Sequence, residues 1–156
     1  MNGAFMENNL TAIDMIHGMG LFRHALRPDL KLPMIATRDV GDYAAQRLLD
    51  LDFSGKQTRE LFGERDLSIA EATAVIARGI AKPDLRYEQF AYVHLGFPRR
   101  KTHLRQRLLH LVIEMFQAIN AGVLAVQEPR SPENSTPTLF ERFVDISLRL
   151  RISERL

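Results

Sequence analysis

The small number of strand-like segments is the feature that limits the fold of this chain most. Three segments read as strands, at residues 31–37, 56–62 and 85–90, and residues 21–26 add a short extended piece. The helical spacing of apolar residues predicts five helices, at about 3–16, 39–50, 68–82, 102–121 and 138–148. Three strands cannot form a doubly wound sheet, and so small a sheet leaves edges that need cover. The sequence therefore predicts a mixed α/β chain with few strands and about five helices.

Helix starts are the clearest local signals. Ser68 and Glu71 are spaced as a capping box, in which each side chain satisfies one free backbone amide of the first turn. Thr138 and Glu141 repeat this spacing, and Asp39 is placed to cap the helix at 39–50. The stripes predicted to face inward are Val40, Tyr43, Ala44 and Leu48; Ala72, Val75, Ile76 and Ile80; Leu104, Leu108, Leu111, Val112, Met115, Phe116 and Ile119; and Phe140, Phe143, Val144 and Leu148.

The composition is that of one globular domain over residues 1–156. Hydrophobic residues make up 46% and charged residues 26%, and the formal net charge is +2. A surplus of two charges is a poor case for a nucleic-acid partner. The absence of cysteine excludes disulfides and thiolate sites. The sequence has no apolar run of membrane-spanning length and no secretory signal at its start, so we expect a cytoplasmic protein without membrane association.

Two groups of residues have the spacing of a binding site, but each has a simpler interpretation. His110 and Glu114 stand four apart on one helix, which is metal-ligand spacing, yet the sequence places no third ligand beside them. A surface ion pair is the simpler interpretation. A basic run could contact phosphates, but a solvated helix entrance is the favoured interpretation. The run consists of Arg99, Arg100, Lys101, Arg105 and Arg107.

Catalytic motifs are missing from the sequence. It contains no nucleophile elbow, no Walker loop and no G-x-G-x-x-G, and Gly18 and Gly20 read as a turn. It has no Tyr-x-x-x-Lys pair either, because Tyr43 is followed at the fourth position by Arg47 and Tyr87 by Ala91. Composition and spacing alone therefore stop at an α/β domain, with no catalytic or metal-binding residue assigned.

Four stretches, taken in order, follow the pattern of one known family. They are residues 3–8, residues 32–45, residues 60–68 with Glu71 and Ala72, and residues 134–138. These stretches resemble the latter half of the NmrA-like proteins, atypical members of the short-chain dehydrogenase/reductase superfamily. The resemblance covers about residues 3–90 and 115–145, whereas the basic segment 93–108 departs from the family pattern.

The resemblance implies the substrate-side lobe of an NAD(P)-binding Rossmann-type protein, with the N-terminal nucleotide-binding half absent from this sequence. It implies NADP or NAD as the cofactor, and a substrate held between the nucleotide domain and this lobe. By position, Phe5, Met6 and Asn8 correspond to a family segment near the nicotinamide, and they are the predicted cofactor-binding residues. The alternative is that Phe5 and Met6 belong to the core.

Three functions stay open at this point. The chain could be part of an oxidoreductase acting on a quinone or a small carbonyl compound. It could instead be a non-enzymatic, redox-sensing regulator that binds a protein partner, or an inactive truncated remnant. Without a nucleotide-binding half, the strand at 56–62 and the helix at 39–50 would lose their cover. We therefore expect self-association or the binding of a complementing half.

Overall fold

The protein has a mixed α/β fold with short strands. The computed structural model describes residues 4–92, 103–123 and 126–149, and the side chains of residues 103–106 are not described. In chain order, the elements are the 3-10 helix η1 (Met6–Ala12), α1 (Ile13–Met19), β1 (Leu21–His24), β2 (Lys31–Pro33), α2 (Thr37–Asp50), β3 (Asp66–Ser68), α3 (Ile69–Gly79), β4 (Arg86–Gln89), α4 (His103–Asn120), α5 (Phe140–Phe143) and the π-helical turn η3 (Val144–Leu148).

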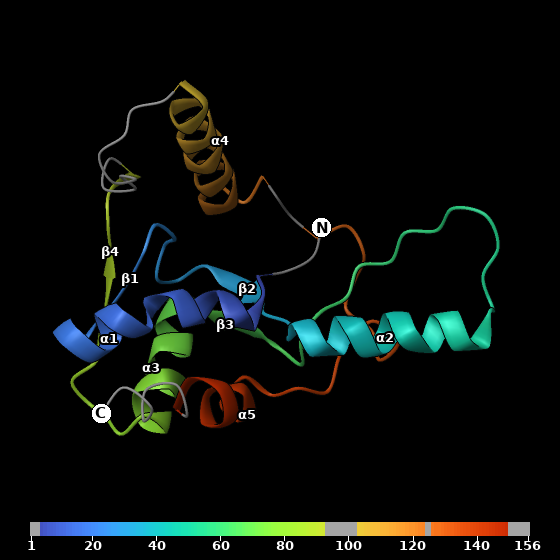
Figure 1. Cartoon of the computed structure of the whole chain (residues 1–156), viewed down its shortest axis with the longest axis horizontal. Coiled ribbons are helices and arrows are strands. Elements are labelled where there is room, and N and C mark those ends of the chain that lie inside the picture. The colour runs from blue at the N-terminus through green and yellow to red at the C-terminus, as the bar shows by residue number, and fades with distance from the viewer. Residues whose placement is uncertain (1–3, 93–102, 124–125, 150–156) are drawn as a thin grey trace.

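The strands pair two by two. β1 lies parallel to β4, and β2 lies antiparallel to β3. The strands predicted at 21–26, 31–37 and 85–90 are present in shortened form, and β3 has no counterpart in the sequence prediction. In Figure 1 the strands lie between α4 on one side and α3 and α5 on the other. The main core forms where α3 packs against α5 and η3, around Ile76, Phe140 and Leu148.

The strand predicted over residues 56–62 is wrong. In that segment only Phe62 pairs, in a single parallel bridge with Ser135. The described residues place no partner strand beside 56–61, so a strand there would leave its amides and carbonyls without ladder bonds. A second bridge of the same kind joins Phe5 to Ile35.

Of the three predicted helix caps, one is confirmed and two are wrong. Ser68 and Glu71 form the predicted capping box: the Glu71 amide donates to the Ser68 hydroxyl at 3.1 Å, and the Ser68 amide donates to the Glu71 carboxylate at 2.7 Å. Asp39 does not cap α2, because its carboxylate accepts from the amide (3.1 Å) and the hydroxyl (2.6 Å) of Thr138. The predicted box of Thr138 and Glu141 fails for the same reason, and the Glu141 carboxylate pairs instead with Arg65 at 2.5 Å.

The first helix is a composite. Residues 6–12 wind as a 3-10 helix, and the α-helical part begins only at Ile13. Gly20 ends it, as predicted, in the left-handed conformation at φ 63°. Tight 3-10 winding brings side chains three residues apart into line.

The inward stripe predicted for α2 is wrong. Of its 14 residues only Asp39 is buried, while Val40 and Tyr43 are half-buried and Leu48 is 64% exposed. Figure 1 shows the reason: α2 extends away from the rest of the described structure, so little of that structure covers its second half. The helix is attached at its start, where the Glu7 carboxylate accepts from the Thr37 amide at 3.1 Å.

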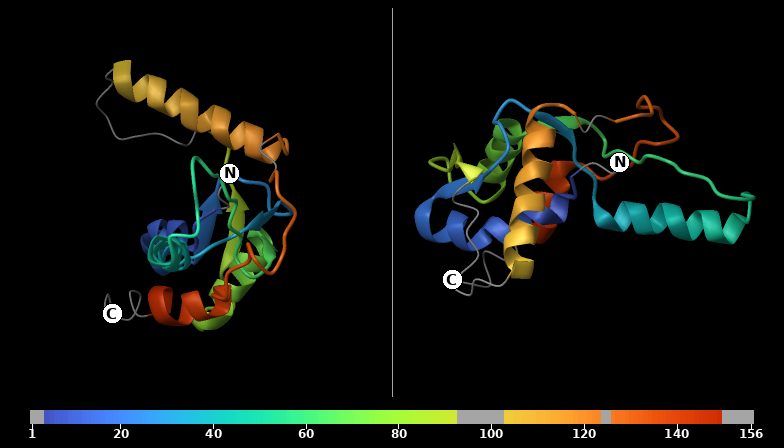
Figure 2. Two further views of the ribbon diagram at one scale, coloured as in Figure 1. Left: turned by 90° about the vertical axis from the view of Figure 1, so that its right-hand side faces the viewer. Right: turned by 90° about the horizontal axis from the view of Figure 1, so that it is seen from above.

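The long helix α4 is present with the predicted bounds and ends at Gly122, which has φ 71°. Its predicted inward stripe is confirmed at the C-terminal end, where Phe116 and Ile119 pack against the core, whereas the side chain of Leu104 lies outside the described residues. Leu108 and Leu111 are exposed, because the N-terminal part of α4 extends past the body of the protein (Figure 2). The stripes of the α3 and α5 regions are largely confirmed. Ala72, Val75, Ile76, Phe140, Phe143, Val144 and Leu148 are buried, and Ile80 is half-buried.

Candidate functional site

A cavity of about 480 Å³ lies beneath the C-terminal half of α4. We call it the α4 cleft. Its walls come from η1, β1, β2 and α4, and most of them are apolar. The apolar wall residues include Phe5, Phe22, Leu26, Met34, Phe116 and Ile119. A cavity of this size with apolar walls and a few polar groups is the usual form of a small-molecule site.

The 3-10 winding of η1 decides which of the predicted cofactor residues reach the cleft. Phe5 stands directly before η1, and Asn8 follows it by three residues, so the two side chains lie in line and both form part of the cleft wall. Met6 lies a third of a turn away, in the hydrophobic core, with 2% of its surface exposed. The structure therefore brings Phe5 and Asn8 together and separates Met6 from them.

His24, the last residue of β1, is one of the polar residues of the cleft that the sequence did not indicate. Its Nδ1 accepts a hydrogen bond from the Leu26 amide at 3.2 Å, and its ring meets Phe116 edge-on with centroids 5.2 Å apart. Burial lowers the pKa of His24 below its ordinary value of 6.5, so the ring is neutral at pH 7. No motif in the sequence marks this residue, because its surroundings come from α4, far along the chain.

Asn120, the last residue of α4, fixes the helix over the cleft. Its amide nitrogen donates to the carbonyl oxygen of Ala25 at 2.9 Å and to the hydroxyl of Tyr92 at 2.6 Å. Its amide oxygen accepts from the backbone amide of Arg27 at 2.8 Å. The 25–27 turn and the end of α4 are thus joined directly beside His24.

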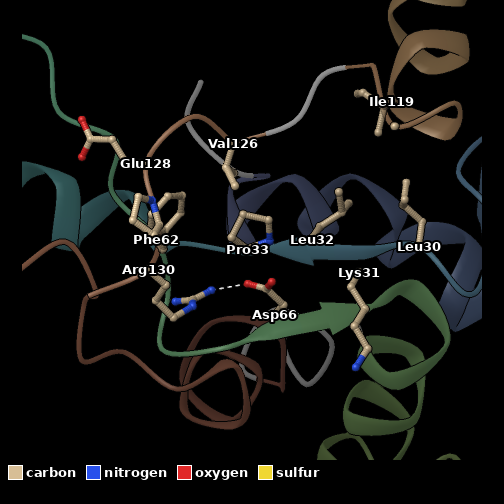
Figure 3. A pocket seen from close by; sticks show the side chains of 12 residues that line it. Leu30, Lys31, Leu32, Pro33, Phe62, Asp66, Ile119, Val126, Glu128 and Arg130 are labelled. Atoms are coloured by element: carbon tan, nitrogen blue, oxygen red, sulfur yellow. Dashed lines mark hydrogen bonds and ion pairs between the residues drawn. The ribbon is translucent and has the colours of Figure 1, made fainter. Parts of the chain in front are cut away.

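A second, smaller cavity of about 350 Å³ lies on the other side of Leu32 and Ile119, which line both cavities. Figure 3 shows Arg130 and Asp66 joined at its edge by an ion pair. Arg130 also donates to the carbonyl oxygen of Gly63 and lies over the Phe62 ring, 5.3 Å from its centroid. Arg130 is held by these contacts and is therefore not free to bind a ligand. We accordingly take the α4 cleft as the candidate binding site.

Tyr87 has a structural role beside the cleft. Its hydroxyl donates to the carbonyl oxygens of His24, at 3.1 Å, and of Leu26. Burial raises the pKa of the Tyr87 phenol well above its ordinary value. It therefore holds the β1 turn and is not placed to donate a proton at neutral pH.

Other predicted features lie apart from the cleft. His110 and Glu114 are both exposed on α4. Within residues 4–92, 103–123 and 126–149, no three potential ligand residues gather as a metal site would require. The same ranges contain no helix that could cross a membrane. Of the basic run, Arg99, Arg100 and Lys101 and the side chain of Arg105 lie outside the described residues, and Arg107 is exposed.

The N-termini of α2 and α3 do not fit a dinucleotide pyrophosphate. Such a group binds where free amides and the helix dipole meet an anion. In α2 the Glu7 carboxylate already binds the Thr37 amide, and in α3 the first amides are held by the Ser68–Glu71 box. Both ends are therefore occupied by negative side chains, which would repel a phosphate.

Comparison with known proteins finds no family model that matches this sequence and no curated protein with a significant match.

Proposed function

We propose that the chain is the substrate-side lobe of an NAD(P)-dependent oxidoreductase of the NmrA-like kind, and that the α4 cleft binds a quinone or a similar small carbonyl compound. The observation that carries the proposal is the convergence of Phe5 and Asn8 with the neutral His24 in one apolar cavity of about 480 Å³. A flat, neutral molecule suits such walls, because burying an apolar ring against them is energetically favourable.

The pairing of the four family-like stretches supports this proposal. The first stretch pairs with the second through the bridge of Phe5 to Ile35. The third pairs with the fourth through the bridge of Phe62 to Ser135, where the Phe62 amide donates to the Asn134 carbonyl at 2.8 Å. Segments that are far apart in the sequence thus lie side by side in pairs, as expected of parts of one structural unit.

In this proposal the dinucleotide carries out hydride transfer, and this chain orients the substrate. A separate nucleotide-binding unit, on a partner or elsewhere in a longer chain, would have to hold the phosphates. The chain described here should therefore bind NADPH no more tightly than about 1 mM. Calorimetric titration with NADPH checks this expectation, and micromolar binding would contradict it.

Titration with 1,4-naphthoquinone tests the proposed cleft. We expect saturable binding at one site, and a loss of affinity of about tenfold or more in Phe116→Ala, which removes an aromatic wall. Leu111→Ala is the matched control, since Leu111 lies on the same helix, is 62% exposed and does not line the cleft. Absence of binding, or equal weakening in both variants, would overturn the proposal.

A second candidate, a regulator that binds a protein partner, is favoured by α2. The helix and the residues after it present Leu48, Leu49, Leu51 and Phe53 to solvent. Exposed apolar side chains gathered on one element are typical of a protein contact surface. A nucleotide-binding unit or a second copy of the chain would cover them, and the inactive remnant remains the outcome if neither binds.

A further inference from the structure

The polar groups of the α4 cleft are mostly occupied by contacts within the protein. The Asn9 amide donates to the carbonyl oxygen of Met6 at 2.8 Å. The Thr11 hydroxyl donates to the carbonyl oxygen of Asn8 at 2.8 Å. Each group therefore already uses one donor hydrogen within the protein.

Arg23 is also restricted. Its Nη2 pairs with the Glu88 carboxylate at 2.7 Å. Its Nε has no hydrogen-bond partner among the described residues, but this atom is fully buried, so a ligand in the cleft cannot reach it without movement of the side chain. Arg23 is thus a poor anchor for an anion.

His24 differs from these groups. Because Nδ1 accepts from the Leu26 amide, the neutral ring carries its proton on Nε2. Nε2 has no acceptor among the described residues, and none of those that line the cleft is an aspartate or a glutamate. The His24 ring, which is part of the cleft wall, therefore keeps one N–H donor that no described residue uses, and the described lining holds no carboxylate that would stabilise a second proton.

We infer that His24 selects the ligand of the cleft by donating a hydrogen bond from Nε2 to a neutral carbonyl oxygen. This inference rests on the proposed function of the cleft. A neutral donor in an apolar wall gives little attraction to a carboxylate or an ammonium group, but it satisfies a carbonyl oxygen that burial would otherwise leave unpaired. Phe5 and Phe116 would then pack against the ring that carries the carbonyl.

The test compares two ligands of nearly the same shape, 1,4-naphthoquinone and naphthalene. His24→Leu removes the donor, so we expect it to weaken quinone binding about tenfold and to leave naphthalene binding within about twofold. In His24→Gln the side-chain amide can still donate, and quinone binding should recover at least in part. Naphthalene binding and the circular dichroism spectrum show for each variant whether the cleft is still folded.

The outcomes separate the two proposals. If the parent chain binds neither ligand, the proposed function of the cleft fails. If the parent binds both ligands but His24→Leu weakens them equally, or weakens neither, the cleft stands and the role of His24 is refuted. Selective loss of the quinone supports the role of His24.

Discussion

Among the glycines of the described residues, Gly63 has the backbone that lies closest to another segment. A Cβ built at this position would clash with the carbonyl oxygen of Met34, which is backbone and cannot move aside like a flexible side chain. We expect Gly63→Ala to lower the free energy of unfolding by about 2–3 kcal/mol or more. The change in urea midpoint measures it.

Gly41 provides the control for this substitution. It lies within α2, and a Cβ there would meet no atom within 4 Å. Gly41→Ala should therefore stabilise the protein slightly, by about 0.5–1 kcal/mol, because alanine favours a helix. Equal midpoints for Gly63→Ala and the parent would show that the contact with Met34 is misplaced.

His24 should make stability depend on pH. Burial lowers its pKa in the folded protein below the ordinary value of 6.5, so the unfolded chain binds the proton more readily. The free energy of unfolding should consequently decrease as the pH falls below about 6.5, and this contribution should be fully present above it. Arg23 and Tyr87 are the other titratable groups beside the ring, and neither supplies a negative charge at neutral pH.

Urea unfolding of the parent and of His24→Gln, measured between about pH 5 and pH 7.5, checks this expectation. As the pH falls, the free energy of unfolding of the parent should decrease relative to that of His24→Gln. Parallel curves across the whole range would mean that His24 is not buried as described.

Whether the sequence could predict a contact depends on how far apart the two residues are in the chain. The Ser68–Glu71 box spans three residues, so its spacing alone predicted it correctly. The contact of Asp39 with Thr138 spans 99 residues, and local spacing gave both side chains a capping role that they do not have. His24 escaped notice for the same reason.

At the scale of elements, Asn120 supplies side-chain hydrogen bonds that attach the end of α4, beside the packing of Phe116 and Ile119 on the core. Asn120 binds Ala25, Arg27 and Tyr92, and Asn120→Ala would leave the carbonyl of Ala25 and the amide of Arg27 without these partners. We expect a loss of about 1–3 kcal/mol in stability. We also expect faster hydrogen exchange in α4 than in α3, because helices held by few contacts open separately from the core.

Gln117→Ala is the matched control, because Gln117 is exposed one turn earlier on the same helix. It should leave exchange in α4 close to that of the parent. If Asn120→Ala changes α3 and α4 alike, then α4 is an integral part of the cooperative core and the attachment is broader than one residue.

The elements also show where periodicity succeeds and fails. The apolar spacing predicted the bounds of α4 well, because helix formation depends on residues three and four apart. It predicted the wrong buried face for most of α4 and α2, because burial depends on which other segments cover a helix. The false strand at 56–62 has the same cause, since a strand needs a neighbour that local alternation cannot supply.

At the scale of the whole molecule, α2 and the segment after it are poorly covered by the other described residues. Leu48 and Leu49 are 64% and 79% exposed, and Leu51 follows them at the end of the helix. Figure 1 shows that α2 and the segment after it extend away from the core. Burying these side chains against another protein surface would gain roughly 25 cal/mol for each Å² removed from water.

We therefore expect the purified chain to associate with itself, or with a complementing nucleotide-binding unit, through α2. Sedimentation at micromolar concentrations should show an average mass that rises with concentration, and the chain should bind a hydrophobic dye. Leu49→Lys should reduce both effects, because it places a charge in the apolar face. Gln46→Lys adds the same charge at another exposed position of α2 and should change them little.

A concentration-independent monomer that binds no dye would contradict this expectation. It would mean that Leu48, Leu49 and Leu51 pack against the body of the protein in solution, and that α2 does not extend as Figure 1 shows. If the monomer still bound naphthoquinone in the α4 cleft, the substrate-side proposal would survive without its partner surface. Loss of both properties would leave the inactive remnant as the remaining interpretation, since neither surface of the chain would then recognise anything.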